Sequence, residues 1–292
     1  GSTNLFKIAE FVQNPSAQSN PLLLMGLVLL VIGFGFKIAS VPFHMWAPDV
    51  YQGAPTPVTA FMAVGPKAAA FAAFFRVFAE AFSEMSPSWE MLLSIIAVLS
   101  MFVGNLGAIM QTNIKRMLAF SSISHAGYIL MAVIAKSSLG SSSMLFYMLT
   151  YTFMTFGVFG IVIILGRKGE ENLEIKNYSG LAYKHPIIAL SMTIFLLSLG
   201  GLPPFAGFVA KFYLFSAAIQ EGLLTLVIIA VLNSAISFYY YLKVVVFMYM
   251  KEPEAEFKIS LTPITLFVVL VGVFGTINLG IFPNAIITLT SH

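Results

Sequence analysis

Apolar runs of roughly twenty residues recur along almost the whole chain, and they constrain its fold more than any other feature. A helix needs about 20 such residues to cross the ~30 Å hydrocarbon core of a bilayer. Of the 292 residues, 59% are hydrophobic and 9% are charged, whereas soluble domains carry about 25% charged residues. Backbone groups in lipid must be satisfied internally, and these runs lack the alternation of barrel strands. The sequence therefore predicts an all-α, multi-pass membrane protein.

We expect a polytopic transmembrane helix bundle of about eight helices, separated by segments rich in Gly, Pro, Ser, Asn and charges. The expected spans are 21–40, 57–82, 90–111, 116–136, 142–166, 186–220, 223–250 and 262–283. The sixth would be about 50 Å long if straight, so Gly200–Pro204 should split it into two half-helices. Gly65–Pro66 should interrupt the second span more mildly. Residues 1–20 are expected to be extramembrane or interfacial, and 284–292 to form a tail.

The loop charges predict an orientation. One side of the predicted bundle holds most of the basic loop residues, namely Lys115, Arg116, Arg167, Lys168, Lys176, Lys184, Lys251 and Lys258. The other side holds Lys7 and Lys136. By the positive-inside rule the first side is cytoplasmic or its topological equivalent.

Several classes of cofactor site are excluded by composition. The chain has no cysteine, so it can hold neither a thiolate-ligated iron–sulfur cluster nor a disulfide. Its four histidines are scattered, and no nucleotide-binding loop or metalloprotease motif is present. The net charge of +3 comes from inter-helix loops rather than a basic patch. We therefore expect no cofactor, no metal and no nucleic acid in this chain, and a lipid bilayer around it.

Two lysines lie deep in apolar runs, each just after a helix breaker. Lys67 follows Gly65–Pro66, and Lys211 follows Gly200–Pro204. A charge at bilayer depth costs about 3 kcal/mol on insertion scales. One interpretation is a structural lysine bound to carbonyls that the breaker has freed. The other is a proton carrier, since breaks in membrane helices supply unpaired carbonyls and room for water.

Three further residues are candidates for the same path. Lys37 ends an apolar run, where snorkelling to the interface is the alternative interpretation. His125 lies midway in the fourth span among serines; a lone membrane histidine can be a packing residue, but it also titrates near neutral pH. Lys115 opens that span and is interpreted mainly as a topology charge. An apolar site disfavours a charged ammonium, so such lysines can release protons near neutral pH, and water could link them through His125.

Three long motifs resemble those of the antiporter-like membrane subunits of respiratory complex I. They are the segments 36–55, from Phe36-Lys37 to Gly53-Ala54-Pro55; 111–128, from Gln111-Thr112 to Gly127-Tyr128; and 199–213, from Leu199-Gly200 to Phe212-Tyr213. The sequences of Val50–Pro55 and of Ser237–Leu242 are most similar to those of the subunit N family of NADH-quinone oxidoreductase. The resemblance runs nearly end to end.

The resemblance implies a fold of about fourteen helices with two inverted five-helix repeats, each containing a broken helix. It makes Lys37 the lysine that pairs with a glutamate on an earlier helix. Lys67 becomes the central lysine, His125 the connecting histidine and Lys211 the terminal lysine. Residues 21–82 would then be a partial first repeat, 90–250 the second repeat and 262–283 a final helix.

The same resemblance implies the function and the setting. We expect a proton-translocating subunit of NADH:quinone oxidoreductase in a bacterial inner membrane or an equivalent membrane, with other membrane-arm subunits as partners. NAD, FMN, Fe–S clusters and quinone would be bound elsewhere in the complex. The family has about six helices before the counterpart of Lys37, so we expect a fragment or a split protein that lacks the partner glutamate. The alternatives are a subunit of a multi-subunit cation/proton antiporter or membrane-bound hydrogenase, and a non-conducting structural membrane subunit.

Overall fold

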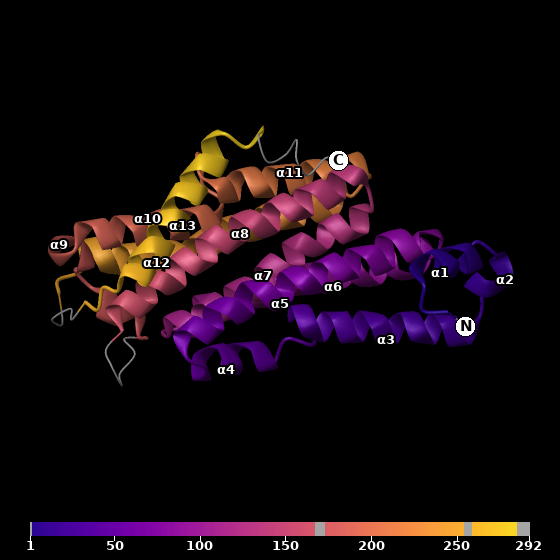
Figure 1. Cartoon of the computed structure of the whole chain (residues 1–292), viewed down its shortest axis with the longest axis horizontal. Coiled ribbons are helices and arrows are strands. Elements are labelled where there is room, and N and C mark those ends of the chain that lie inside the picture. The colour runs from indigo at the N-terminus through magenta and orange to yellow at the C-terminus, as the bar shows by residue number, and fades with distance from the viewer. Residues whose placement is uncertain (1, 167–172, 254–258, 285–292) are drawn as a thin grey trace.

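The structure, a computed structural model, describes residues 2–166, 173–253 and 259–284. Helices make up nearly all of it, and the described residues form no strand beyond an isolated bridge between Asn113 and Glu174. Most of the long helices lie roughly along the longest axis of the molecule, and α13 crosses them obliquely (Figure 1). Some residues assigned from the sequence to loops or to the tail lie outside the described residues, namely Arg167, Lys168, Lys258 and 285–292.

The helices follow in chain order, with three short 3-10 or π segments labelled η. They are α1 (Leu5–Val12), α2 (Pro15–Gln18), α3 (Pro21–Ile38), α4 (Trp46–Gly53), α5 (Thr56–Phe75), η1 (Arg76–Ala81), η2 (Ser83–Met85), α6 (Ser86–Ile109), α7 (Ile114–Ala135), α8 (Ser138–Leu165), η3 (Ile175–Tyr178), α9 (Leu181–Lys184), α10 (Pro186–Gly200), α11 (Ala206–Gln220), α12 (Leu224–Met250) and α13 (Pro263–Ile281).

Within the described ranges, seven helices are long and apolar enough to cross a membrane. They are Pro21–Ile38, Thr56–Ala81, Ser83–Ile109, Ile114–Ala135, Ser138–Leu165, Leu224–Met250 and Pro263–Ile281. Each overlaps one of the spans expected from the sequence. The remaining expected span, 186–220, is built from the shorter apolar helices α10 and α11. These two follow one another along the long axis (Figure 1), so together they take the place of one long helix.

α7 is the central helix of the bundle and is almost wholly buried. It packs against α4, α5, α6, α8, α11 and α12. Two glycines allow its close approach to α6. A Cβ at Gly104 would lie 2.6 Å from the backbone nitrogen of Ser124, and one at Gly127 would lie 2.7 Å from the carbonyl oxygen of Ala97. Small residues are the usual means by which membrane helices approach closely. Here they allow α6 and α7 to pack with their backbones in close contact.

The break predicted at Gly200–Pro204 is confirmed. α10 ends at Gly200, Gly201 has φ +95°, and α11 begins at Ala206. Glycine adopts positive φ without the steric penalty of a Cβ, and proline cannot continue a helix from the preceding turn. The local sequence is therefore sufficient to end one half-helix and begin the next.

The milder interruption predicted at Gly65–Pro66 is wrong, because α5 continues through both residues. Membrane helices tolerate an internal proline when neighbouring groups satisfy the freed backbone. The first break lies earlier in the chain. α3 ends before Ala39, which has φ +58°, and α4 begins only at Trp46. Pro42 is the sequence signal for this break, which falls between the first two expected spans.

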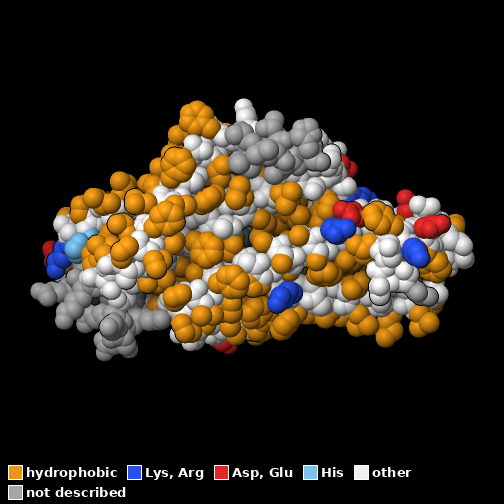
Figure 2. Space-filling model, viewed as in Figure 1, with side chains coloured by type: hydrophobic (Ala, Val, Ile, Leu, Met, Phe, Trp, Pro, Cys, Tyr) orange, Lys and Arg blue, Asp and Glu red, His pale blue; other side chains and the backbone are white. Residues whose placement is uncertain are grey.

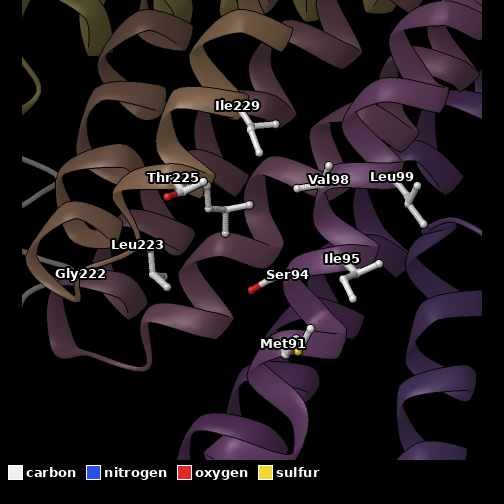
Figure 3. A pocket seen from close by; sticks show the side chains of 10 residues that line it. Met91, Ser94, Ile95, Val98, Leu99, Gly222, Leu223, Thr225 and Ile229 are labelled. Atoms are coloured by element: carbon white, nitrogen blue, oxygen red, sulfur yellow. The ribbon is translucent and has the colours of Figure 1, made fainter.

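The outer surface is mainly apolar. Apolar side chains cover most of the face in Figure 2, whereas charged side chains are few and lie mostly toward the two ends. A groove of about 420 Å³ lies between α6 and the beginning of α12 (Figure 3). It is lined by Met91, Ser94, Ile95, Val98, Leu99, Gly222, Leu223, Thr225, Leu226 and Ile229. None of these side chains ionises.

Candidate functional site

Lys67 lies on the side of α5 that faces α7, and only 3% of it is exposed. Its Nζ donates to the carbonyl oxygen of Ser122 at 3.1 Å and to the hydroxyl of the same residue at 2.8 Å. It forms no ion pair with any described acidic side chain. The charge of this buried amine therefore depends on two neutral oxygen atoms from one residue of the central helix.

His125 lies one helical turn beyond Ser121 and Ser122 on α7, and it is also buried. Its Nδ1 lies 2.7 Å from the hydroxyl oxygen of Tyr147 on α8, and its Nε2 lies 3.2 Å from that of Tyr241 on α12. The Tyr241 hydroxyl lies 2.5 Å from the hydroxyl of Ser121. A hydroxyl can donate or accept, so the imidazole can exchange a proton on either side without leaving its place.

Lys211 is held by the break between α10 and α11. Its Nζ donates to the carbonyl oxygens of Gly200 at 2.7 Å and of Leu199 at 3.3 Å, and to the hydroxyl of Ser234 at 2.8 Å. A helix end leaves its last carbonyls without intrahelical partners, and here those carbonyls accept from the lysine. A Cβ on Gly201 would lie 3.0 Å from the Lys211 Cδ. The glycine thus provides both the backbone turn and the space for the amine.

A small cavity, lined mainly by apolar side chains, lies beside Leu199 and Ser121. It has a volume of about 10 Å³, and its lining includes Ser121, Tyr151 and Thr155. This is close to the smallest space that holds one water molecule, which also needs two to four polar partners. The cavity therefore has room for at most one water molecule, beside Ser121, whose hydroxyl contacts that of Tyr241.

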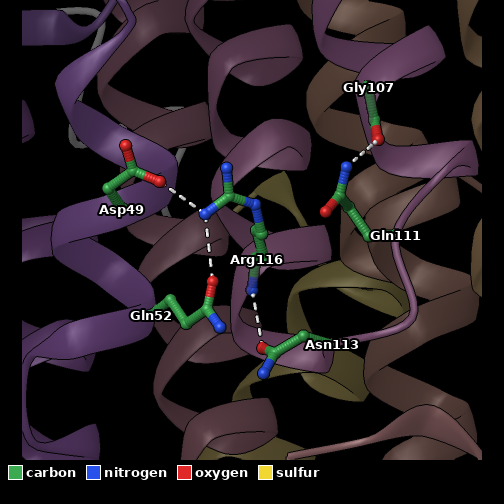
Figure 4. A network of polar contacts seen from close by, with 6 residues as sticks. All are labelled: Asp49, Gln52, Gly107, Gln111, Asn113 and Arg116. Carbon is green, nitrogen blue, oxygen red and sulfur yellow. Dashed lines mark hydrogen bonds and ion pairs between the residues drawn. The ribbon is translucent and has the colours of Figure 1, made fainter.

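The start of α7 is tied to α4 by two basic residues. Lys115 is fully buried, and its Nζ donates to the carbonyl oxygen of Ala54 at 2.7 Å, just past the end of α4. Arg116 donates to the carboxylate of Asp49 at 2.5 Å and to the side-chain oxygen of Gln52 at 3.0 Å (Figure 4). Cations are favoured where a helix ends. These contacts give Lys115 a structural task, whatever part it takes in proton movement.

Lys37 lies apart from the other candidates. It is exposed on α3 and lines a surface groove of about 420 Å³ together with Phe34 of the same helix and Ala70 of α5. The described residues thus bring Lys67, His125 and Lys211 into one buried polar region, with Lys37 outside it.

A second buried polar cluster was missed from the sequence. Asn105 on α6 donates to the carbonyl and side-chain oxygens of Asn233 on α12, at 2.8 and 3.1 Å. Its side-chain oxygen accepts from the hydroxyls of Ser124 at 3.0 Å and of Tyr240 at 3.1 Å. Both asparagines lie within apolar spans, where a polar residue signals a function or a helix contact. The presence of these two asparagines within apolar spans was the sequence feature that could have revealed the cluster.

Comparison with known proteins places this arrangement in a family. The profile described as NADH:quinone oxidoreductase/Mrp antiporter, transmembrane, matches residues 1–237. The chain belongs to this family. A curated relative from Trichlorobacter lovleyi, named NADH-quinone oxidoreductase subunit N, is 52% identical over 288 residues. The match covers 98% of this chain and 59% of the relative. The chain therefore spans about six-tenths of the length of this relative.

Solved structures of the family have the same fold. A chain of respiratory complex I from Thermus thermophilus with bound aureothin has a TM-score of 0.80 and 38% identity. That match covers 92% of this chain and 60% of the other. A chain of the Mrp complex from Dietzia sp. has a TM-score of 0.86 over 100% of this chain and 61% of its own length. At 23% identity, this second likeness speaks for the fold alone. The protein is an integral, multi-pass membrane protein with an antiporter-like helical bundle.

The part of the chain that the structure describes contains no group of three or more His, Cys, Asp or Glu side chains placed to hold a metal ion. Its ionisable groups in the bundle interior are instead amines, an imidazole and phenols. Such groups can hold, pass or release protons, and proton movement is the chemistry that the site offers.

Proposed function

We propose that this protein moves protons through the membrane arm of an NADH:quinone oxidoreductase, coupled to quinone reduction elsewhere in the complex. One observation carries the proposal. Two buried lysines and a buried histidine come from α5, α7 and α11, and all three are held by neutral oxygen atoms rather than by carboxylates. A lysine without a counter-ion in a desolvated site can lose its proton near neutral pH.

Each residue has a role in this proposal. Lys67 is the central carrier, and Ser122 sets the stability of its charged form. His125 connects the two lysines through the hydroxyls of Tyr147 and Tyr241. Lys211 is the terminal carrier at the break between the half-helices. Lys37 and Lys115 complete the set, the first at the α3 surface and the second at the start of α7.

The partners and the domain division are part of the same proposal. Other membrane-arm subunits would pack against the apolar surface, and NAD, FMN, Fe–S clusters and quinone would be bound in other subunits. Residues 21–82 would belong to the first repeat, 90–250 to the second repeat, and 262–283 to a final helix. The broken helix of the first repeat would then be α3–α4, and that of the second repeat α10–α11.

Substitution of Lys67 tests the proposal. Lys67→Arg keeps a charge that arginine cannot release in a protein, whereas Lys67→Ala removes the charge. A proton carrier predicts that both variants lose NADH-driven proton pumping in vesicles while the complex still assembles. A structural lysine predicts that arginine pumps and alanine does not. A topology charge, or a structural subunit without conduction, predicts that both pump like the wild type.

A cation/proton antiporter subunit is the second candidate, and it is favoured by the matching family profile, whose description includes the Mrp antiporter. The two functions differ in what drives transport. If the chain is an antiporter subunit, we expect protons to move in exchange for cations when a cation gradient is applied in the absence of NADH. Our proposal predicts proton movement that depends on NADH oxidation and stops when electron transfer is inhibited.

A further inference from the structure

Tyr128 stands between two groups of the proposed path. It lies almost one turn beyond His125 on α7 and is fully buried. Its ring meets the His125 ring edge to face, with centroids 6.0 Å apart. On α11, the Nζ of Lys211 lies over the Tyr128 ring, 4.9 Å from its centroid. The tyrosine thus touches both the imidazole and the terminal amine.

The Tyr128 ring supplies Lys211 with an aromatic partner, a kind of contact that is not found for Lys67 among the described residues. Lys211 is 4% exposed and forms no ion pair with a described acidic side chain. Its other partners are two carbonyls and a hydroxyl. The negative face of an aromatic ring attracts a cation, and the attraction is strongest when the pair is desolvated. Among the described residues, the hydrogen-bond partners of Lys67 are the two oxygens of Ser122.

The hydroxyl of Tyr128 contributes no such contact. It is buried and makes no hydrogen bond to any described group. The side chains it faces are Asn105 and Ser124. The side-chain oxygen of Asn105 already accepts from Ser124 and from Tyr240, which uses both of its lone pairs. The contacts that Tyr128 makes with His125 and with Lys211 are therefore made by its ring.

We propose that Tyr128 is a positioning residue whose ring stabilises the charged form of Lys211 at the break between α10 and α11. Its importance for transport rests on the proposed role of Lys211 as the terminal proton carrier. The electrostatic pairing between Tyr128 and Lys211 does not depend on that role, because it follows from the geometry of the ring and the amine. The two statements can therefore fail separately.

The test is a direct measurement of lysine charge in the full chain in lipid bilayers. Lysine labelled with ¹⁵N at Nζ reports charged and neutral amines by solid-state NMR, and Lys211→Arg and Lys67→Arg assign the two signals. In Tyr128→Leu we expect the ratio of charged to neutral Lys211 at a fixed pH to fall about tenfold, which corresponds to ~1.4 kcal/mol. Tyr128→Phe keeps the ring and should stay close to the wild type.

Fluorinated phenylalanines at position 128 provide a series that keeps the shape of the ring. Added fluorine withdraws electron density from the ring face, so the charged fraction of Lys211 should fall stepwise with fluorine number. The Lys67 signal should stay constant throughout, as an internal control. Tyr178→Leu, which removes a buried ring outside the path, should leave both signals unchanged.

The inference is overturned if the Lys211 signal is insensitive to fluorination, or if Tyr128→Phe behaves like Tyr128→Leu. An equal response of Lys67 would also overturn it, because the effect would then be general rather than local. Failure of the proposed function has a different signature, since Lys211→Arg would then pump protons like the wild type.

Discussion

Ser122 is the most informative residue to change, because it provides both of the hydrogen-bond acceptors found for Lys67. Ser122→Ala removes the hydroxyl at 2.8 Å and leaves the backbone carbonyl at 3.1 Å. Alanine is smaller than serine and is the best helix former, so α7 should keep its place. The variant therefore removes one of the two hydrogen bonds of Lys67 without removing the lysine, and it also removes the hydroxyl that faces Tyr51 and Tyr151.

The magnitude follows from the contact that is lost. A hydrogen bond to a charged group is worth about 1.5–3 kcal/mol, whereas side-chain hydrogen bonds measured in a membrane protein average about 0.6 and reach about 1.7 kcal/mol. We take about 1–1.7 kcal/mol, since the lysine is buried but sits among other polar groups. One factor of ten in an equilibrium constant is about 1.4 kcal/mol. The charged form of Lys67 should thus become about five- to twentyfold less favourable.

The assay is NADH-driven proton pumping in vesicles, normalised to assembled complex. We expect Ser122→Ala to lower the pumping rate several-fold and Ser122→Thr, which keeps a hydroxyl, to restore most of it. Ser124→Ala is the matched control, because its hydroxyl lies on the same helix but bonds Asn105 rather than a lysine. In a Lys67→Ala background, Ser122→Ala should have no further effect. Wild-type pumping by Ser122→Ala, or an equal loss in Ser124→Ala, would refute the reasoning.

Three further predictions concern stability and orientation. Gly201→Ala should destabilise the protein by about 1–3 kcal/mol, measured by chemical unfolding in detergent, because residue 201 has φ +95° and the new Cβ would press on Lys211. Asn105→Ala should cost about 1–3 kcal/mol in the same assay, since buried polar partners lose their hydrogen bonds. Cysteines placed at the exposed positions Lys184 and Glu221 should label from opposite sides of the membrane, with residue 184 on the cytoplasmic side.

Each of these has a control or a result that would contradict it. Gly26→Ala is the control for Gly201→Ala, because a Cβ at Gly26 meets nothing within 4 Å; equal effects would mean that backbone and space are not the cause. An Asn105→Ala protein as stable as the wild type would show that the cluster of Asn105 and Asn233 does not hold the helices together. Labelling of both cysteines from one side would mean that the chain crosses the membrane differently.

Much of the fold could be predicted because a bilayer leaves the chain few choices. A run of about 20 apolar residues has to become a helix to satisfy its backbone, so each expected span appears within a few residues. The break at Gly200–Pro204 could also be predicted from local sequence. A glycine that can adopt positive φ, followed by prolines, is sufficient to end a helix. The prediction for Gly65–Pro66 failed because surrounding helices determine whether a proline breaks a membrane helix. Local sequence does not contain that information.

The sequence by itself determined which residues ionise, at what depth in the helices they lie, and where the second break falls. The tertiary structure decided which of them meet. Ser122 reaches Lys67 from 55 positions along the chain, and Tyr128 reaches Lys211 from another helix. Lys37 is exposed while Lys115 is buried, although neither outcome can be read from the apolar runs around them. The physical reason is that hydropathy fixes a residue's depth along a helix, whereas packing between distant helices fixes the direction its side chain faces.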